Sequence, residues 1–275
     1  HNNAPELVTD APEVQEQLGH SLYEALRART TLPPITQTHP DVTVEDAYRI
    51  SRAMLALRME RDGERIVGKK IGVTSSAVQE MLGVFQPDFG FLTDAMAFAN
   101  GAEIPASSTL ISPRAEGEIA FRLKHTLSGT DNTDSTVLEA IECFMPCFEI
   151  VDSRIANWQI AIQDTVSDNA SCGVYVLGET ELDPAGVDFA AIQIDLYKNE
   201  APLSSGLGSA VQGNPLTAVA WLANTLGGFG INLEAGEIIL SGSVVPLEPV
   251  EPGDKLRLEM TGPGIASSTS TCSFN

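Results

Sequence analysis

Three glutamates are the residues whose type and spacing point most directly to chemistry. Glu116 and Glu118 stand two apart in the run RAEGEIAF, and Glu149 lies in the run CFEIVDSR. Residues two apart on a strand point to the same face, and both runs alternate, so Glu149 is expected to meet the other two across a sheet. Three packed carboxylates repel one another unless a cation lies between them. This all-oxygen set predicts a site for a hard divalent ion, Mg²⁺ or Mn²⁺.

Exposure to solvent is the simpler alternative for these glutamates. A Glu-x-Glu pair is common in proteins, and carboxylates usually lie at the surface. No lysine or histidine near them in the sequence is an evident partner. The pair alone therefore does not establish a metal site, and the other segments of the chain have to be considered with it.

Five segments together match one family in its order. The chain resembles the 2-hydroxypenta-2,4-dienoate (2-keto-4-pentenoate) hydratases of aromatic meta-cleavage pathways, in the fumarylacetoacetate hydrolase superfamily, over nearly everything after about Val42. The resemblance implies a metal-dependent hydratase that adds water to 2-hydroxypenta-2,4-dienoate, through its 2-oxo-3-enoate tautomer, and gives 4-hydroxy-2-oxopentanoate. The matching segments are GKKIGVTS (68–75), QPDFG (86–90), EGE (116–118), FEIVDSR (148–154) and DNASCG (168–173).

The resemblance also indicates three catalytic candidates. Lys70 and Asp88 lie in segments that the hydratases are thought to use for catalysis, and Ser171 is a candidate for binding the substrate carboxylate or a water. In an extended segment Lys70 shares its face with two glycines, whereas Lys69 points the opposite way. Each candidate has an ordinary alternative: a solvated lysine, a turn-forming aspartate and a backbone-capping serine.

Asp152 and Arg154 are expected to form a local ion pair that orients the strand of Glu149, with a surface pair of little energetic weight as the alternative. None of the histidines is placed by sequence for the histidine-assisted hydrolysis of an acylpyruvase, which disfavours that activity.

Other functions remain open beside the hydratase. One is 4-oxalocrotonate decarboxylase, a sister activity that stabilises an enolate after loss of CO₂; the retained Pro-Asp-Phe-Gly run at 87–90 argues against it. A hydratase of a longer diacid needs a cationic group at the far end of its pocket, and the sequence alone locates none. A non-catalytic scaffold is expected to lose the acid–base residues that this chain keeps.

Composition excludes several partner classes. The 275 residues carry a formal net charge of −21, which argues against nucleic acid and against an anionic membrane surface. No apolar run is long enough to span a bilayer. The four cysteines have neither a zinc-binding spacing nor the density of a disulfide scaffold, and we expect free thiols in a cytoplasmic protein.

By resemblance we expect a homo-oligomer acting on a small 2-hydroxydienoate or 2-oxo acid, with possible association with a neighbouring pathway enzyme.

Periodicity predicts helices first and strands later, which is typical of an α+β chain. We expect an N-terminal helical segment, residues 1–64, and a β-rich catalytic domain, residues 65–275, as one structural unit. The resemblance implies the mixed β-roll of the fumarylacetoacetate hydrolase type. The expected helices are 11–29, 43–63, 135–143 and 216–226, and the expected strands are 65–73, 116–123, 146–151, 174–177, 192–197, 237–240 and 255–260.

Two stretches near the C-terminus depart from the family pattern. Residues 244–249 read VVPLEP where the hydratases tend to be small and glycine-containing, and residues 266–273 are rich in serine and threonine. If the first stretch borders the pocket, it affects which substrate chain length is accepted. The three glutamates are independent of both stretches.

Overall fold

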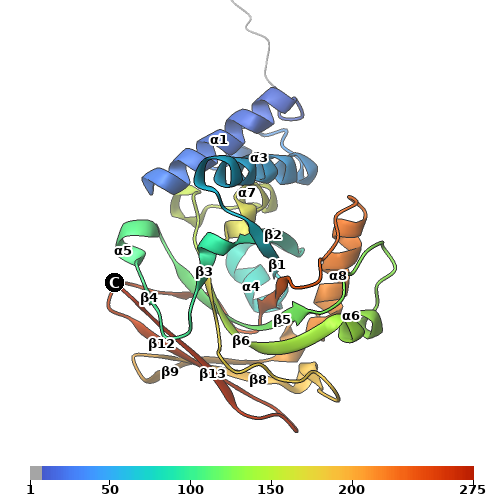
Figure 1. The fold of residues 1–275 in the computed structure, drawn as a ribbon. Helices are drawn as coiled ribbons and strands as arrows, with labels where there is room; N and C mark the ends of the chain where they lie inside the picture. Colours follow the sequence, from blue (N-terminus) through green and yellow to red (C-terminus); the bar gives the residue numbers. More distant parts are fainter. Residues whose placement is uncertain (1–7) are drawn as a thin grey trace, which may run out of the picture.

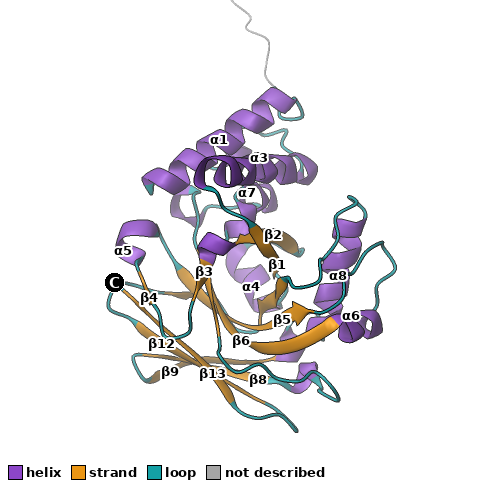
Figure 2. Cartoon of the chain, viewed as in Figure 1, coloured by secondary structure: helices purple, strands orange, loops and turns teal. Residues whose placement is uncertain are grey.

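Helices α1, α3 and α7 lie at one end of the molecule, above two packed sheets, and α6 and α8 lie beside the sheets (Figure 1, Figure 2). The computed structural model describes residues 8–275, so residues 1–7 of the expected helical segment lie outside the described residues. Every helix within residues 8–275 is too short or too polar to cross a lipid bilayer. The α-helices are α1 Pro12–Ala28, α2 Ile35–Thr38, α3 Val44–Asp62, α4 Ser76–Leu82, α5 Ala106–Thr109, α6 Asp134–Ala140, α7 Ile162–Ser167 and α8 Pro215–Gly227.

Helices α1 and α3 pack closely and begin and end where local signals predict. Thr43 and Asp46 form a reciprocal capping box at the start of α3, and Gly63 ends it in the left-handed conformation with φ 67°. Gly19 allows α1 to approach α3, since a Cβ on this residue would lie 2.6 Å from Ala53 Cβ. The two expected N-terminal helices are confirmed.

The larger sheet carries the residues singled out by sequence. Its strand order is β2-β1-β10-β5-β6-β7-β3, with β11 also paired to β5. Parallel pairs, β1 with β10 and β3 with β7, interrupt an otherwise antiparallel sheet. Its strands are β1 Ile66–Gly72, β2 Asp88–Thr93, β3 Ala97–Phe98, β5 Arg114–Leu123, β6 Ile141–Val151, β7 Val174–Leu177, β10 Ile238–Ser243 and β11 Glu248–Pro249.

A second sheet covers the apolar face of β5. A Cβ on Gly117 would lie 3.1 Å from Ile194 Cγ2 and 3.3 Å from Leu258 Cδ1, both in this second sheet. The alternation expected for this strand is therefore confirmed, as is the mixed β-roll. The second sheet has the order β4-β13-β12-β8-β9, with β4 Glu103–Ile104, β8 Gln193–Lys198, β9 Ala201–Leu207, β12 Lys255–Thr261 and β13 Ser268–Phe274.

The expected strands omit β2 and β9, and two further differences from the expected elements show the effect of strand pairing. The helix expected over 135–143 ends at Ala140, because Ile141 and Cys143 pair with Leu123 and Arg122 and begin strand β6. The hydroxyl-rich tail forms β13, a strand between β4 and β12, although no alternation of apolar and polar residues predicts a strand there. In both places, pairing with a strand distant in sequence outweighs the local pattern.

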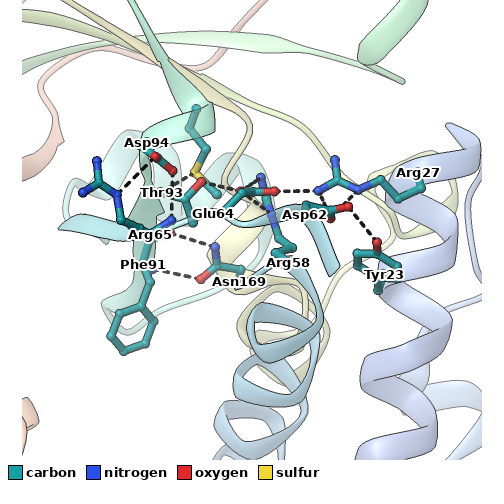
Figure 3. Close-up of polar contacts among 11 residues, drawn as sticks. Tyr23, Arg27, Arg58, Asp62, Glu64, Arg65, Phe91, Thr93, Asp94 and Asn169 are labelled. Atoms are coloured by element: carbon teal, nitrogen blue, oxygen red, sulfur yellow. Dashed lines mark hydrogen bonds and ion pairs between the residues drawn. The ribbon is translucent and has the colours of Figure 1, made fainter. Parts of the chain in front are cut away.

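A buried polar network joins the helices to the larger sheet (Figure 3). Glu64 accepts hydrogen bonds from Arg58 Nε at 2.9 Å, from Arg27 Nη2 at 2.6 Å and from Thr93 Oγ1 at 2.5 Å. These partners come from α3, α1 and β2. One carboxylate therefore fixes how the helical layer sits on the sheet.

Replacing Glu64 by alanine is expected to lower the free energy of unfolding by about 3–5 kcal/mol, because Arg58 would stay buried without its anion. Glu60→Ala, at an exposed position of α3, is the matched control and should change it by less than about 0.5 kcal/mol. Urea denaturation of the two variants measures both values. Equal midpoints for the two variants would contradict the anchoring role.

Candidate metal centre and active site

The structure brings the three glutamates together inside the molecule. Glu116 lies directly opposite Glu149 in the pairing of β5 with β6, and Glu118 follows two residues along the same face. One carboxylate oxygen from each lies within 4.8 Å of the others. All three side chains are buried, at most 5% exposed. The solvent-exposed alternative for these residues is therefore excluded.

Burial and mutual repulsion set the electrostatics of this cluster. Burial, together with the charge of Glu149, raises the pKa of Glu116 to about 8. The pKa of Glu118 is raised further above its usual range, by burial and by both neighbouring carboxylates. Within residues 8–275, Glu118 Oε2 and Glu149 Oε1 accept no hydrogen bond. Buried acceptor oxygens that face one another fit a hard divalent cation.

Lys70 supplies the cationic neighbour that the sequence did not reveal. Its Nζ lies 3.1 Å from Glu149 Oε2, and the side chain is 2% exposed. Burial disfavours the charged ammonium, but Glu149 and the other acidic groups outweigh it and raise the pKa of Lys70 well above its usual value. Lys69 points the opposite way, as expected, and pairs with Glu237 at 2.6 Å. This partner was not evident from the sequence, because Lys70 is distant from Glu149 in the chain and β10 and β5 lie between their strands in the sheet.

Asp88 begins strand β2 and faces the same cavity as Lys70. Its carboxylate is 1% exposed and accepts no hydrogen bond from the described residues. The turn-forming alternative is therefore wrong. Burial, opposed by Lys70, raises the pKa of Asp88 to about 6. Gly72 leaves room beside this carboxylate, since a Cβ there would lie 2.2 Å from Asp88 Oδ1 and 3.4 Å from Lys70 Nζ.

Ser171 reaches the cavity from a strained segment. Asn169, Ala170 and Ser171 have φ angles of 52°, 52° and 56°, a left-handed run that costs free energy for residues other than glycine. The Asn169 side chain both accepts from and donates to the backbone of Phe91, at 2.9 Å each, which ties the segment to β2. Ser171 Oγ lies 2.9 Å from Thr165 Oγ1. Ser171 and Thr165, which belongs to α7, therefore present a hydroxyl pair to the cavity.

The expected Asp152–Arg154 ion pair was wrong. Arg154 Nε donates to Asp168 Oδ1 at 2.7 Å, and the Arg154 backbone N–H donates to Asp168 Oδ2. Asp152 instead accepts from the backbone N–H groups of Ile111 and Ser112, at 2.8 and 2.7 Å. Arg154 pairs with Asp168 because the chain folds back after Arg154 and brings Asp168 against it. This buried pair anchors the start of the strained segment.

One cavity connects these groups. Its charged lining residues are Lys70, Asp88 and Glu116, and five of its apolar lining residues form one hydrophobic cluster. Leu247 belongs to this cluster, so the unusual 244–249 stretch does border the cavity. The sequence did not indicate Thr165 and Trp158 as cavity residues, since neither lies in one of the five segments that match the family. The lining residues are Lys70, Gly72, Val73, Val78, Leu82, Asp88, Glu116, Val151, Trp158, Thr165, Ala170, Ser171 and Leu247.

Comparison with known proteins gives the class to which this fold and site belong. The family profile described as "Fumarylacetoacetate (FAA) hydrolase C-terminal" matches residues 61–270. A 4-oxalocrotonate decarboxylase from Pseudomonas putida G7, solved with magnesium and adipate, superposes with a TM-score of 0.90 at 31% identity, over 98% of this chain and 100% of that one. The chain therefore belongs to the fumarylacetoacetate hydrolase family.

Curated relatives make the resemblance more specific. The chain is 59% identical to a 2-hydroxyhexa-2,4-dienoate hydratase of Comamonas testosteroni, over 92% of this chain and 96% of the relative. It is 56% identical to a 2-hydroxypent-2,4-dienoate hydratase of Pseudomonas putida, over 78% of this chain and 96% of the relative. The resemblance to these hydratases, drawn from five short segments, is confirmed.

Glu118→Gln is expected to weaken binding of Mg²⁺ or Mn²⁺ by more than about tenfold. Replacing a residue that only orients a metal ligand already lowers metal affinity by about that factor, and Glu118 is proposed as a ligand itself. The physical reason is the loss of one of three anionic donors. Isothermal titration calorimetry of chelator-treated protein measures the affinity, and circular dichroism checks the fold. Glu179→Gln, at an exposed position, is the control. Equal affinities for Glu118→Gln and wild type would refute the site.

The left-handed segment predicts a difference between two substitutions at Ser171. Both Ser171→Gly and Ser171→Ala remove the hydroxyl, but only glycine adopts a φ of 56° without steric cost. The glycine variant should therefore be more stable than the alanine variant by about 1 kcal/mol. Urea denaturation decides. If the alanine variant is equally stable or more stable, the segment is not strained.

Proposed function

We propose that the protein is a divalent-metal-dependent hydratase, a hydro-lyase of aromatic catabolism, that converts 2-hydroxypenta-2,4-dienoate into 4-hydroxy-2-oxopentanoate. The observation that carries the proposal is the convergence of the three glutamates with Lys70 and Asp88 around one buried cavity. Relatives that share 59% and 56% of their residues with this chain are named as hydratases of 2-hydroxydienoates.

The proposed metal ion is Mg²⁺ or Mn²⁺, held by Glu116, Glu118 and Glu149. Carboxylate oxygens without nitrogen or sulfur donors suit such hard ions. When bound, the ion supplies a Lewis acid that stabilises negative charge on the substrate oxygen at C2. The glutamates hold it in a buried place where charge–charge interactions are weakly screened by water.

The reaction requires two proton movements along the carbon chain. The C2 hydroxyl loses its proton and C5 gains one, which gives the conjugated 2-oxo-3-enoate. Water then adds its oxygen to C4 while a proton reaches C3, so the product gains one water. We assign these proton transfers to Asp88, because a pKa of about 6 lets this carboxyl accept and release protons near neutral pH.

Lys70 and Ser171 have supporting roles in this proposal. The Lys70 ammonium stays charged beside Glu149, and it stabilises the carboxylate form of Asp88. The Ser171 hydroxyl, bonded to Thr165, orients the attacking water or the substrate carboxylate. Neither residue needs to change its protonation state, so Asp88 alone carries the protons.

Decarboxylation of 4-oxalocrotonate is the second candidate function. The observation that favours it is the TM-score of 0.90 to a decarboxylase at 31% identity. The hydratase relatives are closer in sequence, at 59% and 56% identity. The two reactions differ in mass balance, since one gains water and the other releases CO₂, so one product analysis separates them.

We also propose that the enzyme acts in the cytoplasm, as a homo-oligomer, with residues 1–64 and 65–275 as one structural unit. Free cysteines suit a reducing compartment, and the four in this chain are free and buried. The Glu64 network supports a single unit, because it ties α1 and α3 to β2. Exposed apolar side chains at Met59, Ile66 and Phe229 support self-association.

The test is to mix chelator-treated protein with 2-hydroxypenta-2,4-dienoate, with and without Mg²⁺ or Mn²⁺, and follow the loss of dienoate ultraviolet absorbance. We expect metal-dependent conversion to a product one water heavier. Asp88→Asn should lower kcat by about 10²–10⁴-fold with little effect on metal affinity, because it removes the proton carrier and spares the three glutamates. CO₂ release from 4-oxalocrotonate without hydration of the dienoate would assign the decarboxylase instead.

A further inference from the structure

Part of the cavity lining is an apolar wall. Val78 from α4, Val151 from the end of β6 and Leu247 from the 244–249 stretch are 2%, 3% and 2% exposed, and they form one hydrophobic cluster. Leu82 and Trp158 pack against this cluster, and all five side chains line the cavity. The charged lining residues Lys70, Asp88 and Glu116 are not part of this cluster. A carbon tail that packs against the wall therefore meets only apolar groups.

A cation nevertheless lies next to this wall. Arg114 pairs with Val151 across the sheet, one step outward from the Glu116–Glu149 pair and on the same face of β5. Its guanidinium makes no ion pair within residues 8–275. Arg114 does not line the cavity, although its neighbour Val151 does. The structure thus holds an arginine without an anionic partner next to a site for anionic substrates.

Trp158 covers that arginine. Arg114 Cζ lies 4.5 Å from the centroid of the Trp158 ring, in cation–π geometry, and the indole also lines the cavity. The ring is held in place, because its Nε1 donates to the Ser112 carbonyl at 2.9 Å. The backbone at Asn157 and Trp158 adopts φ angles of 56° and 53°, a costly conformation for an aromatic residue. A strained turn with a directed hydrogen bond thus holds the indole against Arg114.

We propose that Trp158 shields Arg114 from the cavity and so selects substrates whose far end is uncharged. This inference rests on the proposed hydratase function and names the specificity of the same site. A vinyl or alkyl end packs against Val78, Leu82 and Leu247. A second carboxylate at that end loses its hydration against the apolar wall without gaining the guanidinium as a partner.

Two six-carbon acids form a matched pair for the test. In 2-hydroxyhexa-2,4-dienoate the far end is a methyl group, and in 2-hydroxyhexa-2,4-dienedioate it is a carboxylate on the same chain. For the metal-loaded wild-type enzyme, kcat/KM for hydration of the monoacid should exceed that of the diacid by at least about 100-fold, since apolar pockets reject even one added hydroxyl by about that factor. Ultraviolet absorbance gives the rates, and product mass separates hydration from CO₂ loss.

Three variants test the shield itself. Trp158→Ala uncovers Arg114 and should move the monoacid-to-diacid ratio at least about tenfold toward the diacid. Trp158→Phe keeps a ring over the guanidinium and should keep the ratio near that of wild type. The double variant Trp158→Ala with Arg114→Met removes the cation and should restore the preference for the monoacid. A ratio of two substrates is not moved by a general loss of folded enzyme, so it separates specificity from stability.

The outcomes distinguish this inference from the proposed function. Hydration of both acids at similar kcat/KM by the wild type would overturn the shield and leave the hydratase intact, and this test needs no variant. A shift toward the diacid that persists in the double variant would overturn the role of Arg114. Hydration of neither six-carbon acid would overturn this inference and, if 2-hydroxypenta-2,4-dienoate is not hydrated either, the proposed function as well. CO₂ release from the diacid as the main reaction would overturn both proposals.

Discussion

Three carboxylates buried within 4.8 Å of one another cannot all carry charge without a cation, and this constraint shapes everything around them. Glu116 and Glu118 repel each other and Glu149, and the local response is a raised pKa at Glu116 and Glu118. Lys70 neutralises part of that charge at 3.1 Å from Glu149. The rest fits a divalent ion. A fold that buries this cluster must therefore hold β5, β6 and β1, with β10 between β1 and β5, in a fixed register.

The two-sheet architecture meets that requirement by separating the faces of β5. One face places Gly117, with no side chain, against Ile194 and Leu258 of the second sheet, so the sheets approach closely and exclude water. The opposite face carries Glu116 and Glu118, and Glu116 lines the cavity. Close packing on one side of β5 thus excludes water. Electrostatic interactions among the charged groups on the other side are stronger because water screens them only weakly.

Strain is concentrated where the chain borders the cavity beside the glutamates. Val73, Trp158, Ala170 and Ser171 all line the cavity and all have positive φ angles near 55°. Rigid contacts hold two of these segments: the Arg154–Asp168 pair and the Asn169 amide for one, and the Trp158–Ser112 hydrogen bond for the other. Energy stored at a binding site and compensated by the surrounding structure is typical of positions that must present a group in one orientation.

The sequence by itself determined the elements and contacts that depend on nearby residues. Capping at Thr43, the left-handed stop at Gly63 and the alternation of Glu116, Glu118 and Glu149 are local properties, so their consequences follow from chain geometry. The five motifs added the family and its candidate residues. The strand β13 and the early start of β6 were missed, because partners distant in sequence decide strand pairing.

Only the tertiary structure decided which charged groups meet. Lys70 reaches Glu149 across the curl of a sheet in which β10 and β5 separate their strands, and Arg154 turns from Asp152 to Asp168. The spacing of these residues in the sequence predicts neither contact. Electrostatic energy depends on distance and burial in space, and a linear chain specifies neither until distant strands have found their register.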